Sequence, residues 1–141
     1  MRFLVTSILL AGTAAVVVLA AQNPMRPGQW ETVMQMEMPG MPMKMPAQKM
    51  VQCITKEQLS KPDGGLPGTK PGETNPCTVS DHKVDGNKIT WNMTCAEPQA
   101  MTGSGEIVVD GDAYTGTMKM NSDKGQMTMK YAAKRLGACE P

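Results

Sequence analysis

Apolar and polar residues alternate with a period of two over several separate stretches of this chain. In residues 28–38, Trp30, Met34 and Met38 fall on one side of the alternation, and Glu31 and Glu37 fall on the other. The same alternation returns in residues 48–54, 77–83, 89–95, 105–109, 114–120 and 127–131. A period of two indicates a β-strand that is buried on one face. The pattern therefore predicts about seven short strands.

Turn-forming sequences separate most of these stretches. Asp85-Gly86-Asn87, Asp110-Gly111-Asp112 and residues 121–125 each lie between two predicted strands, which is typical of β-hairpins. Residues 61–76 are rich in proline and glycine and predict a long loop. Just before it, Thr55 and Gln58 have the spacing of a capping box, which predicts one short helix. The predicted fold is an all-β antiparallel meander, curled or closed into a barrel so that no long edge is left open.

The first twenty residues have a different pattern, which predicts export. Arg2 gives a positive start, residues 3–20 are mostly apolar, and the run ends in the small residue Ala20. These features predict a signal peptide over residues 1–20, cleaved after Ala20 or Ala21, and a single β-rich domain over residues 21–141. A retained membrane anchor is the alternative, because the apolar run approaches the ~20 residues that a spanning helix needs. Cleavage leaves no membrane span and a periplasmic or secreted bacterial protein.

The charge and the cysteines of the chain each exclude one kind of binding. The sequence has 14 basic and 13 acidic residues, and removal of Arg2 makes the exported part neutral, which argues against a nucleic-acid partner. Cys53, Cys77, Cys95 and Cys139 form no C-x-x-C pair, so they predict two disulfides rather than a zinc site. The order of a meander favours the pairs Cys53–Cys77 and Cys95–Cys139. The pair Cys77–Cys95 is the alternative, because both residues are equally distant from the turn at Gly86.

Methionine is the unusual component of the exported part. It has fourteen methionines, against twelve leucine, isoleucine and valine residues and four aromatic residues. Many methionines must therefore be buried, as adaptable filling of the interior. The shared face of the predicted strands defines one apolar interior. The residues expected to line it, and any ligand held there, are Trp30, Met34, Met36, Trp91, Met93, Tyr114, Met118, Met127 and Met129.

A second use of methionine is metal binding. Met41, Met43 and Met45 continue the alternation of the first strand, but Pro42 and Pro46 interrupt it, so this segment is an edge strand or an extended loop. Thioether sulfur is a soft ligand that suits Cu(I) or Ag(I). These three methionines are the candidate ligands for such a metal, and no other cofactor is expected.

Several short sequences together resemble a known bacterial family. They are Pro27-Gly28-Gln29-Trp30-Glu31, Met36-Glu37-Met38-Pro39-Gly40-Met41-Pro42, Gln52-Cys53-Ile54-Thr55, Trp91-Asn92-Met93-Thr94-Cys95, Gly103-Ser104-Gly105-Glu106, Tyr114-Thr115-Gly116 and Arg135-Leu136-Gly137-Ala138-Cys139. In this order, and behind a signal peptide, they are similar to the family called domain of unknown function 3617. The resemblance implies an exported, β-rich protein with paired cysteines. It implies no catalytic residue, because the family defines none.

Three functions remain open at this point. The favoured one is a non-enzymatic module whose methionine- and tryptophan-lined interior binds an apolar small molecule or an envelope protein. The alternatives are a periplasmic Cu(I) or Ag(I) binder and a purely structural envelope protein. An enzyme is not expected, because the single histidine, His82, has no predicted acid–base partner on its face of the strand and is expected at the surface.

Overall fold

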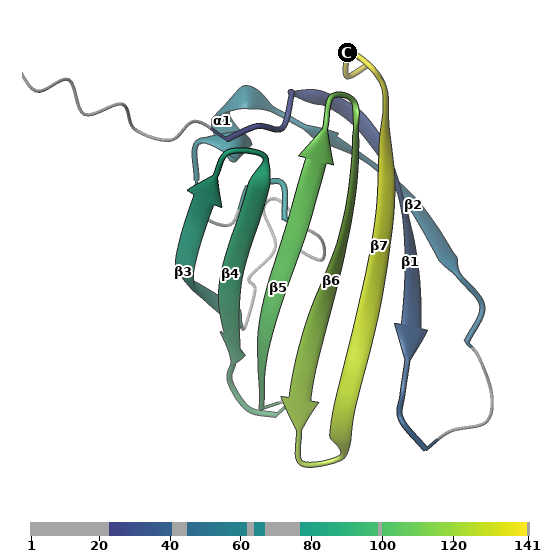
Figure 1. Ribbon diagram of the computed structural model, residues 1–141, viewed down its shortest axis with the longest axis vertical. Helices are drawn as coiled ribbons and strands as arrows, with labels where there is room; N and C mark the ends of the chain where they lie inside the picture. The colour runs from purple at the N-terminus through teal and green to yellow at the C-terminus, as the bar shows by residue number, and fades with distance from the viewer. Residues whose placement is uncertain (1–22, 41–44, 62–63, 67–76, 99, 141) are drawn as a thin grey trace, which may run out of the picture.

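The computed structural model describes residues 23–40, 45–61, 64–66, 77–98 and 100–140. Within these residues, seven strands form one antiparallel sheet, which confirms the predicted all-β meander (Figure 1). The elements are β1 (Gly28–Glu37), β2 (Gln48–Ile54), α1 (Lys56–Leu59), β3 (Cys77–Asp85), β4 (Lys88–Cys95), β5 (Met101–Asp110), β6 (Ala113–Ser122) and β7 (Gly125–Gly137). The order in the sheet is β2-β1-β7-β6-β5-β4-β3.

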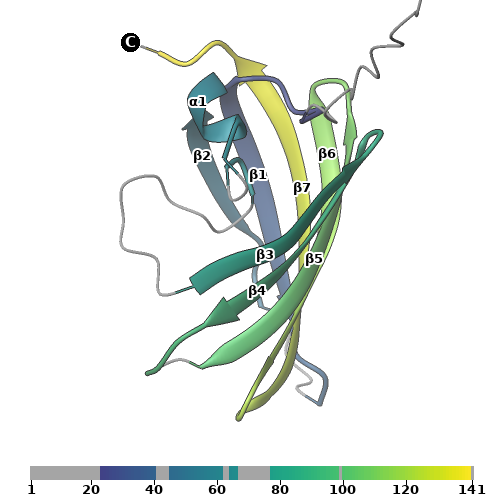
Figure 2. The same ribbon diagram turned by 90° about the vertical axis from the view of Figure 1, so that its left-hand side faces the viewer.

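The sheet is curled and open rather than closed into a barrel. Its two edges are β2 and β3, and the side view shows the sheet bending around one concave face (Figure 2). The pairing of β1 with β7, from Gln29↔Gly137 to Glu37↔Thr128, joins the first strand to the last. Of the two predicted forms, the structure therefore has the curled sheet.

The alternation of the sequence separates the two faces of this sheet. On β4, Ile89, Trp91 and Cys95 are buried in the concave face, whereas Asn92 and Thr94 on the convex face are exposed. Ion pairs cross the strands on the convex face: the Glu31 carboxylate lies 3.4 Å from the ammonium groups of both Lys49 and Lys134. Surface ion pairs contribute little to stability. Burial on the concave face therefore supplies most of the stabilisation.

One end of the concave face is covered by the segment before β1 and the segment after β2. Met25, Ile54 and Leu66 are buried there, with Leu59 of α1 packed against them. The capping box predicted for α1 is present. The Thr55 hydroxyl accepts a hydrogen bond from the backbone N–H of Gln58, and the side-chain oxygen of Gln58 accepts one from the backbone N–H of Thr55. The cap fixes the helix start and so holds Leu59 over the sheet.

The two predicted disulfides are present, but the favoured pairing is wrong. The bonds are Cys53–Cys139 and Cys77–Cys95, instead of Cys53–Cys77 and Cys95–Cys139. Strand order is the reason: β2 and β3 lie at opposite edges of the sheet, so Cys53 is remote from Cys77. Cys77 lies directly opposite Cys95 in the β3–β4 hairpin, as the alternative pairing required.

Strands β5 and β7 are longer than predicted. β5 begins at Met101 instead of residue 105, and Gly103 and Gly105 lie within it, each paired with both neighbouring strands. The strand continues through both glycines. Large side chains from the neighbouring strands fill the space where a glycine side chain is absent. A Cβ added at Gly103 would contact Met120, and one added at Gly105 would overlap the Trp91 ring.

A candidate binding site at the methionine end of the sheet

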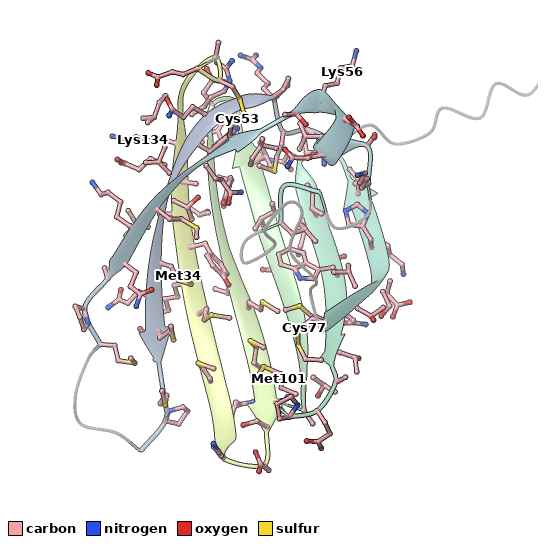
Figure 3. The ribbon with its side chains drawn as sticks, turned by 180° about the vertical axis from the view of Figure 1, so that it is seen from behind. Met34, Cys53, Lys56, Cys77, Met101 and Lys134 are labelled. Carbon is pink, nitrogen blue, oxygen red and sulfur yellow. A yellow bond between two sulfur atoms is a disulfide. The ribbon has the colours of Figure 1, made fainter. Side chains whose placement is uncertain are left out.

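Methionines gather at one end of the concave face on each of five strands. Along β1, Trp30 and Thr32 come first and Met34 and Met36 follow. On the other four strands, too, the methionines of the concave face lie toward the same end of the sheet. We call one half the methionine end: Met34, Met36, Met93, Met101, Met118, Met120, Met127 and Met129. We call the other half the aromatic end: Trp30, Thr32, Ile89, Ile107, Val109 and Tyr114. In Figure 3, sulfur atoms gather over the half of the sheet that includes Met101, and the disulfide of Cys53 lies at the opposite end.

The aromatic end is a closed core. Trp30 is 0% exposed, its ring centroid lies 5.5 Å from that of Tyr114, and its indole nitrogen donates to the Arg26 carbonyl at 2.9 Å. The hydroxyl groups of Thr32 and Tyr114 are hydrogen-bonded at 3.1 Å. Every large group here has a packing or hydrogen-bonding partner, so this half is structural.

The methionine end is arranged as rows across neighbouring strands. Met129 lies opposite both Met36 and Met118, so three adjacent strands each place a methionine in one row. In the next row Met127 lies opposite Met120. Met118 and Met120 are buried, but Met34, Met36, Met93, Met101, Met127 and Met129 are only half-buried. The described residues therefore leave part of this apolar surface open.

Tyr131 connects the two halves of the concave face. Its hydroxyl lies 3.8 Å from the Met118 sulfur and 3.5 Å from the Met129 sulfur. Burial, assisted by the nearby Tyr114, raises the pKa of Tyr131 to about 12. The hydroxyl is therefore protonated at neutral pH and donates towards the sulfurs, which are weak acceptors. The two sulfurs thus converge on a neutral, buried group.

A cavity of about 310 Å³ lies at the outer edge of the methionine end. Its apolar wall comprises Met38, Pro98, Ala100, Met101 and Met127. Its polar rim comprises Ser122, Asp123, Lys124 and Gln126, from the β6–β7 turn. Binding pockets for small molecules have volumes of ~300–1,000 Å³ and are mainly apolar with a few polar groups. This cavity falls at the small end of that range.

A cavity of about 460 Å³ on the convex face has a different character. Its lining includes Asp81, Lys83, Asn92, Glu106 and Lys119, which are all exposed. Several of these groups already have partners: Asn92 donates to Asp81 at 2.9 Å, and Glu106 pairs with Lys88 at 2.9 Å. This surface is charged with both signs and solvated, so the methionine end is the stronger candidate site.

All nine residues that the sequence predicted as lining lie on the concave face, but they do not form one surface. Trp30 and Tyr114 belong to the closed aromatic end, and Trp91, at the border, is only 2% exposed. The predicted metal ligands Met41 and Met43 lie outside the described residues, and Met45 is 40% exposed. His82, expected at the surface, is half-buried: its Nε2 atom is buried and has no hydrogen-bond partner within the described part of the chain.

The sequence did not identify Met101, Met120 and Tyr131 as residues of this site. Met120 and Tyr131 fall at the ends of stretches whose alternation was recognised. Every second residue of a strand lies on the same face, so this alternation was sufficient to place both residues on the concave face. Met101 lies before Gly103 and Gly105, which hid the start of β5.

Comparison with known families identifies the family of the chain. Residues 25–139 match the model of a family described as "Protein of unknown function (DUF3617)". The chain belongs to the DUF3617 family. The match extends from Met25, in the cover of the aromatic end, to Cys139 of the Cys53–Cys139 disulfide, and so includes every strand of the sheet. No curated protein and no solved structure matches the chain.

Two kinds of feature are absent from the described part of this DUF3617 protein. No cluster of three or more histidine, cysteine, aspartate or glutamate residues that could hold a metal occurs there. No helix within the described ranges is long and apolar enough to cross a membrane. The signal peptide predicted for residues 1–20 lies outside these ranges.

Tyr131 should make the stability of this DUF3617 protein sensitive to alkaline pH. An unfolded tyrosine loses its proton near pH 10, whereas native Tyr131 holds it to about pH 12. Its contribution is therefore fully present below pH 10 and is lost as the pH rises through 12, with a fall of about 2 kcal/mol in the free energy of unfolding. Urea titrations at pH 9, 10, 11 and 12 measure this fall.

Tyr131→Phe is the matched control, because it removes the ionisable group and keeps the ring. We expect the variant to lose less stability than the wild type between pH 10 and 12. Equal losses in the two proteins would contradict a role of Tyr131.

Proposed function

We propose that this protein is an exported, non-enzymatic binding module that takes an apolar small molecule at its methionine end. The observation that carries the proposal is the contrast between the two halves of one sheet face. The aromatic end is covered by Met25, Leu59 and Leu66, whereas the methionine end continues as half-buried side chains to the cavity beside Met101 and Met127. An apolar ligand would complete the burial of this surface.

The residue type supports a binding surface that adapts to its ligand. Methionine has three rotatable bonds and a polarizable sulfur, so it fits irregular shapes better than leucine or isoleucine does. The closed aromatic end instead has isoleucine and valine, which are stiff at χ1. The same sheet thus combines a rigid half and an adaptable half.

The polar rim of the cavity favours a ligand with an apolar body and a polar end. Ser122, Asp123, Lys124 and Gln126 lie at the β6–β7 turn, whereas Met101 and Met127 are half-buried on the concave face. Burial of a hydrocarbon body against the methionines stabilises the complex in proportion to the apolar area removed from water. A polar end group would stay at the rim in contact with water.

The disulfides support the proposal that the protein works in an oxidising compartment. All four are in disulfides, and disulfides persist in exported proteins and are rare in the cytosol. Together with the predicted signal peptide, this supports a binding function in the bacterial periplasm or outside the cell.

Met101→Lys tests the binding site directly. A lysine ammonium at the cavity would disfavour an apolar ligand, and we expect the affinity for the neutral dye Nile red to fall at least tenfold. Fluorescence titration of the dye measures the change. Met101 lies at the half-exposed end of β5, so the lysine can reach water and the fold should be retained.

Val108→Lys is the matched control on the same strand. Val108 is 39% exposed on the convex face, so its replacement should leave dye binding unchanged. Equal effects of both variants, or no saturable dye binding by the wild type, would contradict the proposed function. Circular dichroism of both variants checks that the sheet is intact.

A further inference from the structure

We infer that Met36, Met118 and Met129 form a binding site for a soft monovalent metal ion, Cu(I) or Ag(I). The inference goes beyond the proposed function, because the ligand is a metal ion and these three methionines do not line the cavity beside Met101. It also differs from the predicted metal segment at Met41, Met43 and Met45, which lies on another part of the chain.

The sheet register brings the three side chains together. Met129 on β7 lies opposite Met36 on β1 and opposite Met118 on β6. All three point into the concave face. Residues directly opposite each other on neighbouring strands have Cβ atoms ~4.5–5.5 Å apart. Methionine side chains are long enough for three sulfurs at this spacing to meet at one point.

The contacts of Tyr131 show that two of these sulfurs do converge. The Met118 and Met129 sulfurs lie 3.8 Å and 3.5 Å from the same Tyr131 hydroxyl oxygen. Packing alone requires only that the side chains fill space, and it does not require their sulfur atoms to approach one polar group. A metal ion would replace this weak hydrogen-bond donor as the partner of the sulfur lone pairs.

The chemistry of the ligand set selects the class of metal. Thioethers are soft, neutral ligands that suit Cu(I) and its analogue Ag(I), whereas Mg²⁺ and Ca²⁺ prefer oxygen. The four cysteines are in disulfides and offer no thiolate. His82, the single histidine of the sequence, lies on the edge strand β3, and the methionine row lies on β1, β7 and β6. The thioethers are therefore the soft ligands available in the described sheet.

Ag(I) titration of the exported, disulfide-bonded protein, labelled with ¹³C at the methionine methyl groups, tests the site. Ag(I) is diamagnetic, so NMR reports each methyl group separately. We expect the signals of Met36, Met118 and Met129 to shift together and to saturate at one equivalent. The signal of Met25, which lies in the cover of the aromatic end, should stay in place.

Leucine variants give the matched comparison, because leucine keeps the apolar volume and costs less than ~1.5 kcal/mol at most core sites. Met36→Leu and Met129→Leu should each weaken Ag(I) binding at least tenfold. Met25→Leu should leave the affinity unchanged, as should the triple variant Met41→Leu, Met43→Leu, Met45→Leu. Both half-buried positions, Met36 and Met129, are used so that the result does not depend on the buried Met118.

Three results would overturn the inference. They are shifts that never saturate, shifts of all methionines alike, and a loss of binding in the triple variant but not in Met129→Leu. Nile red binding by Met129→Leu separates this inference from the proposed function. Because leucine keeps the apolar surface, dye binding should persist in this variant whether or not the metal site exists.

Discussion

Replacing Cys53 and Cys139 by serine should lower the free energy of unfolding by about 4.5 kcal/mol. The two residues are 86 positions apart, so their bond closes most of the exported chain into one loop. In the chain-entropy model, a cross-link reduces the entropy of the unfolded chain more as the loop becomes longer. The bond also ties the edge strand β2 to the C-terminal end of β7 across β1. Urea unfolding followed by circular dichroism measures the loss.

The second disulfide is the internal control for this prediction. Cys77 and Cys95 are 18 positions apart, and the same model gives about 3 kcal/mol for their bond. Their double serine variant should therefore be more stable than the variant that lacks Cys53–Cys139. The reverse order of stability would contradict the loop-length explanation.

The sequence predicted the strands because strand formation leaves a local pattern. The β3–β4, β5–β6 and β6–β7 hairpins each have an alternating stretch on both sides of a short turn, and the concave side chains of β4 and β6 were assigned correctly. The capping box of α1 was visible for the same reason: Thr55 and Gln58 are three residues apart and contact each other directly.

The disulfide pairing could not be predicted because it depends on a distant contact. Gln29 of β1 lies opposite Cys53 of β2 on one side and Gly137 of β7 on the other. This arrangement brings Cys53 close to Cys139. The pairing of β1 with β7 joins residues about a hundred positions apart, and the alternation within either strand does not specify its partner.

The open and covered parts of the concave face could not be distinguished for a similar reason. Strand parity shows which residues share a face, and it placed Trp30 and Met36 together correctly. The cover over Trp30 comes from Met25, Leu59 and Leu66, which lie in irregular segments or in a single helical turn. These segments have no periodicity, so the sequence did not show which half of the face they cover.

Gly105→Ala should cost about 3 kcal/mol, although the substitution adds only one methyl group. Gly105 lies directly opposite Trp91, whose indole ring lies over the glycine. A Cβ at this position would come closer than 3.0 Å to three atoms of that ring. Trp91 is only 2% exposed, so the ring has little room to move, and overpacking of this kind typically costs ~1–3 kcal/mol. Thermal and urea unfolding measure the cost.

A double-mutant cycle with Trp91→Ala separates this clash from the intrinsic effect of replacing a glycine. Trp91→Ala alone should cost ~3–5 kcal/mol, because it leaves a cavity in the core. Once the ring is absent, Gly105→Ala should add almost nothing, which gives a coupling of about 3 kcal/mol between the two positions. Additive costs would show that the glycine is required for its backbone rather than for the indole.

The same cycle reports on the methionine end, because Gly105 continues the row of Met36, Met129 and Met118 across β5. In the wild type the Trp91 ring fills the place of the absent side chain and closes this row on one side. In Gly105→Ala a ring displaced along this row would press against Met118, so Ag(I) binding should weaken. Removal of the ring in the double variant should relieve the pressure on Met118. Recovery of ligand binding despite a lower stability would show that the indole sets the position of the methionine row.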